Sequence, residues 1–348
     1  MLGIPNMKMK GFLAAAATVA AAGAVLAACG AGGSSGDTTG TSAGQVTVYL
    51  GRHYGIEQVF SAFSAETGIG VRFTTGRDPE LRERLKTEGK NTPADVYLAA
   101  DAANLELAAT DGLLAPLGSS VVSAAVPAAL RDPQDRWTAL SVRARTVMRA
   151  TRVPEAEAPR SYAALGDARW KGKLCLRPAT HPYTQSLVAA LIADGGVAAA
   201  ERIVKGWVAN APTYLDSDTK ILEALADGTC DVAVTNTYYL LRARSEGKDL
   251  AQVVWITDGP GTHVNVSGAG IATHAPNPSG AKRLIEWLAT NGQRSFADAN
   301  FEEPAAASVA PRAEVAALGS YTRDPIAVER FGALQPEAVK LLDRAGHR

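Results

Sequence analysis

The chain has 348 residues, and its 35 lysines and arginines balance its 35 aspartates and glutamates, so its formal net charge is zero. Nothing in this balance points to nucleic acid as a partner. The length exceeds what one hydrophobic core comfortably supports, so we expect two domains or lobes.

Residues 1–28 have the features of an export signal. Lys8 and Lys10 precede an apolar run of small residues over 11–28, which is followed by Cys29. This resembles a bacterial lipoprotein signal peptide, which implies cleavage before Cys29, a lipid on its thiol, and anchoring to the outer face of the cytoplasmic membrane or in the periplasm. A transmembrane helix is the alternative, because the run approaches the ~20 residues that cross a bilayer. Loss of the leader would take the net charge from 0 to −2.

Residues 29–44 are rich in glycine, serine and threonine, as flexible tethers are, so the folded part is expected to begin at Gln45. Strands and helices then alternate, which predicts an α/β fold with a largely parallel sheet. Asp78 is the expected N-cap of one helix, with Pro79 at its first position and Gly89 after its end. The other elements predicted in this part are strands over 45–50, 69–75 and 94–100, and helices over 56–67 and 102–110.

Residues 137–150 alternate apolar and polar side chains, as a strand with one solvated face does, and such a long strand could cross between lobes. A second α/β lobe should follow, and residues 264–273 predict a strand that returns to the first lobe. Two crossings would make a hinged cleft. The expected boundaries are 45–138 with about 264–300 for the first lobe, and about 143–262 with 301–348 for the second. The remaining predicted elements are strands over 172–177, 231–235 and 253–257, and helices within 185–193, 198–208, 218–226, 280–290, 336–344 and from 239.

Two further cysteines, Cys175 and Cys230, lie near predicted strands. In an exported protein they could form a disulfide, and two buried free thiols are the alternative. Neither spacing is that of a metal motif.

Tyrosines occur where strand patterns give way to helical ones. Tyr238 and Tyr239 follow an apolar strand, and Tyr54 and Tyr183 occupy similar junctions elsewhere. Ligands of α/β proteins bind at such junctions. Four phenols from three junctions suggest a site for a hard cation, whereas a single tyrosine here would more often only pack its ring.

Several phrases resemble ferric-iron-binding proteins of ABC importers, in the FutA-like branch of the extracellular solute-binding proteins. The most specific are His53-Tyr54 and Asn236-Thr-Tyr-Tyr239, and the others lie within 170–177, 183–187, 205–210 and 261–270. The resemblance covers about Val46 to Asn300. It implies a two-lobed, type II periplasmic-binding-protein fold with iron in a hinged cleft. It also implies Tyr54, Tyr183, Tyr238 and Tyr239 as ligands, with His53 as a candidate fifth.

Ferric ion suits anionic oxygen, and a bound cation can hold a phenol deprotonated far below its usual pKa of ~10. Four phenolates around a trivalent ion leave a net charge of −1. The residues considered for charge balance or support of the ligands are Arg52, Arg143, Arg145, Arg177 and Asp101. Ordinary ion pairing is the alternative for the arginines, and helix capping is the alternative for Asp101. His181 and His263 are expected to support ligands or lie on the surface.

The expected function is therefore a monomeric, lipid-anchored receptor that captures ferric iron and delivers it to an ABC permease. Leu50, Gly51 and 301–304 depart from the family pattern, so the affinity and any preference between ferric and ferrous iron stay open. The sequence also leaves open whether an anion such as carbonate joins the site. One alternative is an organic or oxyanion ligand, such as a phosphonate, thiamine or a polyamine, on the same fold. The other is an extracytoplasmic enzyme. The sequence does not favour it, because from Gln45 onward there is no nucleophile-elbow Gly-x-Ser-x-Gly, no His-Glu-x-x-His and no paired acidic motif that would favour catalysis.

Overall fold

The structure is a computed structural model that describes residues 44–51 and 54–348. The predicted leader, the tether up to residue 43, Cys29, Arg52 and His53 lie outside the described residues. Among the described helices, none is both long and apolar enough to span a bilayer.

Eleven strands form one sheet in the described chain, in the order β2-β1-β3-β10-β5-β8-β6-β7, with β4 paired to β10 and both β9 and β11 paired to β5. The strands are β1 (Gln45–Leu50), β2 (Gly70–Thr75), β3 (Val96–Ala99), β4 (Leu114–Ala115), β5 (Thr138–Arg149), β6 (Leu174–Leu176), β7 (Thr213–Tyr214), β8 (Val232–Asn236), β9 (Gln252–Val254), β10 (His263–Ala272) and β11 (Glu303–Pro304). The α-helices are α1 (Ile56–Thr67), α2 (Asp78–Glu88), α3 (Ala102–Thr110), α4 (Ser120–Ala125), α5 (Pro182–Ala209), α6 (Asp218–Asp227), α7 (Thr237–Ser245), α8 (Pro278–Ala289), α9 (Gln293–Ala299), α10 (Ala313–Ala316) and α11 (Arg330–Ala345).

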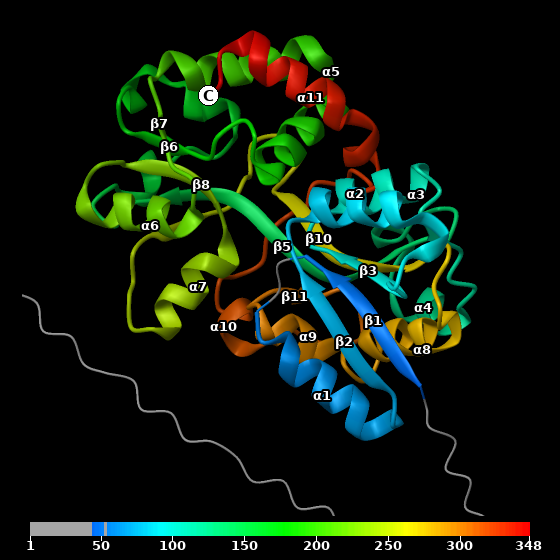
Figure 1. The fold of residues 1–348 in the computed structure, drawn as a ribbon. Coiled ribbons are helices and arrows are strands. Elements are labelled where there is room, and N and C mark those ends of the chain that lie inside the picture. Colours follow the sequence, from blue (N-terminus) through cyan, green and yellow to red (C-terminus); the bar gives the residue numbers. More distant parts are fainter. Residues whose placement is uncertain (1–43, 52–53) are drawn as a thin grey trace, which may run out of the picture. The chain divides into compact units, whose positions relative to one another are not determined.

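Each end of the sheet is parallel and the middle is antiparallel. β1 runs parallel to β2 and β3, and β6 runs parallel to β7 and β8. The long strands β5 and β10 run antiparallel to each other and join these two parts. We call the part built on β1–β3 the first lobe and the part built on β6–β8 the second lobe; Figure 1 shows β5 and β10 passing between them. The structure thus has the predicted α/β organisation.

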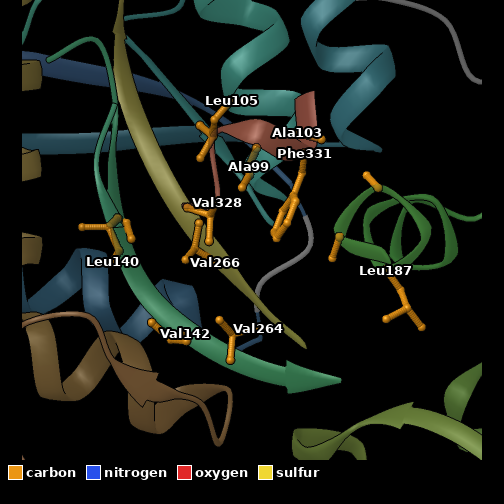
Figure 2. Packing of buried hydrophobic residues seen from close by; sticks show 14 of the residues in the cluster. Ala99, Ala103, Leu105, Leu140, Val142, Leu187, Val264, Val266, Val328 and Phe331 are labelled. Carbon is orange, nitrogen blue, oxygen red and sulfur yellow. The ribbon is translucent and has the colours of Figure 1, made fainter. Parts of the chain in front are cut away.

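Apolar side chains from several elements pack into one continuous core. Leu105 of α3, Val266 of β10 and Phe331 of α11 meet where the first lobe reaches α11, and Figure 2 shows Leu140 and Val142 of β5 nearby. Helix α11 packs along α5 and also against α3, so it connects the two lobes on this side. Burial of these side chains is the main source of stability for the arrangement.

The expectation that β5 has one solvated face is wrong. All its residues are buried except Arg149, which is half-buried. The polar members of the alternation, Arg143 and Arg145, have hydrogen-bonding partners inside the protein, so they do not need solvent.

Asp78 is not the N-cap of α2, because the helix begins at Asp78 and Arg77 precedes it. The Asp78 carboxylate instead accepts the backbone N–H of Ala100 at 2.9 Å, which links α2 to the end of β3. The same carboxylate explains Gly51, since a Cβ there would lie 1.9 Å from Asp78 Oδ1.

The two helices expected within 185–193 and 198–208 are confirmed: they are the two parts of α5, separated by a kink at Gly196, whose φ of 77° is readily adopted by glycine. Some other boundaries do move. Helix α7 begins at Thr237, two residues before the expected start. Helix α11 begins at Arg330, so Pro336, the expected start, lies inside it.

Cys175 and Cys230 form a disulfide in the structure, with their Cα atoms 5.9 Å apart. Both residues are fully buried. The bond joins β6 to the segment just before β8, so it lies within the second lobe.

Gly268 of β10 should not tolerate a side chain. An added Cβ would lie 2.5 Å from the Thr138 carbonyl oxygen and 2.8 Å from Leu105 Cδ1, where the β5–β10 register shifts. We expect Gly268→Ala to lower the free energy of unfolding by about 1–3 kcal/mol, measured by urea denaturation. Gly70→Ala is the control, because its Cβ would meet nothing closer than 3.7 Å. Equal effects of both substitutions would contradict the close packing of β10 on β5.

Candidate metal centre

All four predicted phenols lie at or near the beginnings of helices. Tyr183 is in the first turn of α5, and Tyr238 and Tyr239 are in the first turn of α7. Tyr54 lies two residues before α1. The unpaired N–H groups and the dipole at a helix N-terminus favour negative charge, which suits a phenolate.

The structure brings three of these tyrosines together. The hydroxyl oxygens of Tyr183 and Tyr238 are 3.4 Å apart, and the ring centroids of Tyr238 and Tyr239 are separated by 4.2 Å. Tyr183 and Tyr238 are buried and Tyr239 is half-buried. A pair of adjacent hydroxyl oxygens with a third phenol alongside is a suitable start for a set of anionic oxygen ligands.

Tyr54 approaches the same helix from the first lobe. Its backbone N–H donates to Asn300 Oδ1 at 3.0 Å, and its ring lies 3.3 Å from the guanidinium carbon of Arg242. Arg242 belongs to α7, the helix that begins with Tyr238 and Tyr239. The Tyr54 side chain is 39% exposed, so among the four it is the one most open to solvent.

Arg143 and Arg145 supply positive charge beside the phenols. Because they are two residues apart on β5, they point to the same face of the sheet. Their guanidinium carbons lie 5.1 Å and 5.7 Å from the centroid of the Tyr183 ring. Both arginines are buried, so their charge acts on the phenols with little screening by water.

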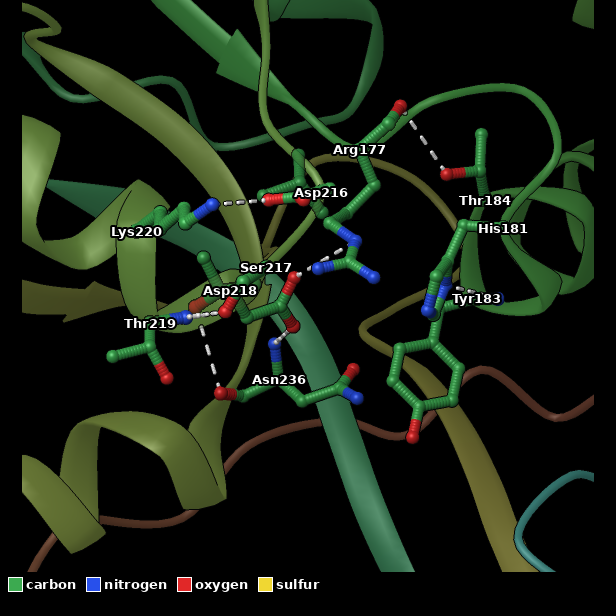
Figure 3. A network of polar contacts seen from close by, with 12 residues as sticks. Arg177, His181, Tyr183, Thr184, Asp216, Ser217, Asp218, Thr219, Lys220 and Asn236 are labelled. Carbon is green, nitrogen blue, oxygen red and sulfur yellow. Dashed lines mark hydrogen bonds and ion pairs between the residues drawn. The ribbon is translucent and has the colours of Figure 1, made fainter. Parts of the chain in front are cut away.

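Asp218 balances two of the arginines in the second lobe. Its carboxylate accepts a hydrogen bond from Arg145 at 3.0 Å and lies 3.8 Å from Arg177. Figure 3 shows Asp218 between Arg177 and Asn236, with Tyr183 nearby. Burial lowers the pKa of the Arg177 guanidinium, and Arg145 lowers it further, while Asp218 acts in the opposite direction.

Arg143 connects to the first lobe instead. It donates to the carbonyl oxygen of Ala100 and to Ser267 Oγ at 3.4 Å. Burial alone would lower the pKa of its guanidinium, but the charges of Tyr183 and Glu302, among others, outweigh burial and raise that pKa above its usual value. Arg143 therefore stays charged beside the phenols.

Asp101 is the N-cap of α3, which was one of its two expected roles. Its carboxylate accepts the N–H groups of Ala103 and Asn104 at 3.0 and 3.3 Å. It also accepts hydrogen bonds from Ser186 and Asn265, at 2.7 and 2.8 Å.

The two histidines differ from each other. His181 is the N-cap of α5, and its Nδ1 accepts the Tyr183 N–H at 3.2 Å. Sequence reasoning missed this role because serine, threonine and aspartate are the usual caps. His263 is fully buried rather than on the surface; burial, together with Arg145 and Arg143, lowers the pKa of its imidazole to about 3.

A cavity of about 390 Å³ opens at this place, lined by residues from both lobes. The first lobe contributes 76–79, Ala100 and Asp101. The second lobe contributes Asp216, Tyr239 and residues between Arg177 and Tyr183. Across the described part of the chain, no group of three or more His, Cys, Asp or Glu side chains is placed to hold a metal ion. Of the four predicted phenols, Tyr183 and Tyr239 line this cavity.

The family of bacterial extracellular solute-binding proteins matches residues 58–327. The chain belongs to this family. Among its relatives, Iron uptake protein A1 of Synechocystis sp. is 36% identical over 342 residues, which cover 94% of this chain and 95% of that protein. The Major ferric iron-binding protein of Neisseria meningitidis serogroup B is 28% identical over 313 residues, covering 86% and 92% of the two chains.

Solved structures agree with this family membership. The FutA (IdiA) protein of Trichodesmium, in complex with iron and citrate, superposes on this solute-binding protein with a TM-score of 0.82 at 35% identity, covering 87% of this chain and all of that one. Apo FutA2 from Synechocystis has a TM-score of 0.81 at 33% identity, covering 87% of this chain and 99% of that one. The predicted two-lobed periplasmic-binding-protein fold is confirmed by these matches.

Asp218 should be essential to the stability of this solute-binding protein. Asp218→Asn leaves Arg145 and Arg177 buried without their carboxylate, and we expect a loss of about 3–5 kcal/mol in the free energy of unfolding. Chemical denaturation at neutral pH measures it. Asp216→Asn is the matched control: Asp216 is exposed and pairs with Lys220, and such pairs contribute little. A stable Asp218→Asn protein would show that the buried arginines are balanced in some other way.

Proposed function

We propose that this protein captures ferric iron outside the cytoplasmic membrane through tyrosine phenolates and delivers it to an ABC permease. The observation that carries the proposal is the pair of hydroxyl oxygens of Tyr183 and Tyr238, 3.4 Å apart beside Arg143 and Arg145. The iron-related names of the relatives, and the iron in the Trichodesmium structure, support it.

The charges around the phenols suit the cargo. A phenol at its usual pKa of ~10 is protonated near neutrality, and a trivalent ion together with nearby guanidinium groups favours the phenolate. We propose Tyr183, Tyr238 and Tyr239 as ligands from the second lobe and Tyr54 as the ligand from the first. His53 is a candidate fifth ligand and Arg52 a candidate for charge balance, and both lie outside the described residues. An accompanying anion such as citrate fits the same scheme, as in the Trichodesmium structure.

Delivery requires that the permease distinguish the loaded form. Because the ligands come from both lobes, bound iron stabilises the closed arrangement, and only that arrangement aligns both lobe surfaces for a partner. We propose that the hinge lies in β5 and β10, with lobe boundaries at 45–138 plus about 264–300 and at about 143–262 plus 301–348. The receptor would act as a monomer without catalysing a reaction.

Ferric binding predicts a visible colour. Adding ferric citrate to apo-protein should produce a tyrosinate-to-iron charge-transfer band, and Tyr183→Phe and Tyr239→Phe should each weaken iron binding at least about tenfold and reduce the band. Tyr49→Phe is the control, since its hydroxyl bonds to Glu88. A colourless wild-type protein without bound iron would refute the proposal and favour an organic or oxyanion ligand, such as a phosphonate, thiamine or a polyamine.

The membrane anchor is tested separately, in cells that produce the full chain. Labelling with an alkyne fatty acid should mark the wild-type protein, and Cys29→Ala should lose the label because the thiol is the attachment point. Absence of label from the wild type would instead favour a leader that remains as a membrane helix.

A further inference from the structure

One hydrogen bond connects the first lobe to the helix that carries Tyr183. The hydroxyl of Ser186 on α5 donates to Asp101 Oδ2 at 2.7 Å, and both residues are almost fully buried. Ser186 lies three residues after Tyr183, so the two side chains share one face of α5. A bond to Ser186 therefore holds the turn from which the Tyr183 phenol projects.

The first lobe fixes Asp101 firmly. Oδ1 caps α3, while Oδ2 also accepts the side-chain amide of Asn265 on β10 at 2.8 Å. Asn265 in turn accepts the Ala102 N–H at 3.0 Å. Asp101 is thus held in place by α3 and by the crossing strand β10. Its hydrogen bond to Ser186 therefore attaches α5 of the second lobe to a fixed position in the first lobe.

We propose that Asp101 is a positioning residue that ties the two lobes together through Ser186 and so slows the release of iron; this rests on the proposed function. Asp101 lines the cavity, but both its carboxylate oxygens are occupied by hydrogen bonds from the protein. It acts through Ser186 and not as an iron ligand.

The effect follows from the difference between closed and open arrangements. When the lobes separate, the buried Ser186–Asp101 bond is lost, so the bond stabilises the closed, iron-retaining form alone. Hydrogen bonds to charged groups are stronger than neutral ones, and removal of this one should speed iron release roughly tenfold.

The test is the rate at which excess EDTA removes iron from the loaded protein, followed by the charge-transfer band. Ser186→Ala should release iron roughly tenfold faster while the band keeps its position and intensity, since no ligand is lost. Ser61→Ala is the matched control: this hydroxyl also lies on a helix but bonds to the Glu57 carbonyl within α1, so release should stay at the wild-type rate.

A double-mutant cycle distinguishes loss of the Ser186–Asp101 hydrogen bond from a general loss of protein stability. Asp101→Ser keeps a good capping hydroxyl for α3 but lacks the second oxygen, so combining it with Ser186→Ala should add nothing to the release rate of Asp101→Ser alone. Independent effects would overturn the inference, as would an unchanged rate in Ser186→Ala. A shifted band in Asp101→Ser would also overturn it, by placing Asp101 on the iron. A wild-type protein that takes up no iron would instead refute the proposed function.

Discussion

The structure depends on how positive charge is buried at the centre of the sheet. Arg143 and Arg145 stand on β5 where it passes between the lobes, and neither reaches bulk water. Removing a guanidinium from water costs several kcal/mol unless hydrogen bonds and an opposite charge replace the solvent. The surrounding polar residues supply these hydrogen bonds and the opposite charge.

The two arginines meet it in different lobes. Arg145 is paired with Asp218 and bonds to the Val234 carbonyl oxygen at 3.1 Å, both in the second lobe. Arg143 bonds to Ala100 in the first lobe and reaches the buried carboxylate of Glu302 through Ser267, whose hydroxyl donates to Glu302 at 3.4 Å. Two residues that are close together on β5 thus each bind to a different lobe. Both guanidinium groups also lie next to the Tyr183 ring.

Local patterns predicted the elements well and their long-range partners poorly. The helix expected over 56–67 is α1, because its apolar face and the following glycine are signals within the segment. The tyrosines could be selected because junctions of strand and helix are also local. Asp218, by contrast, reads as an ordinary acidic residue in the first turn of a helix, and its partner Arg145 lies 73 positions away. The alternation of β5 was misread for the same reason: a polar residue that pairs with a distant carboxylate looks like one that faces solvent.

The buried His263 shows how the two arginines affect a neighbouring titratable group. His263 stands opposite Arg145 in the β5–β10 pairing, and protonation would add a positive charge where two guanidinium groups are already buried. With its pKa lowered to about 3 by burial, Arg145 and Arg143, the imidazole stays neutral near neutral pH. It therefore adds no positive charge beside the two arginines. The positive charge beside Tyr183 thus belongs to Arg143 and Arg145, which the fold holds in place through Ala100 in the first lobe and Asp218 in the second.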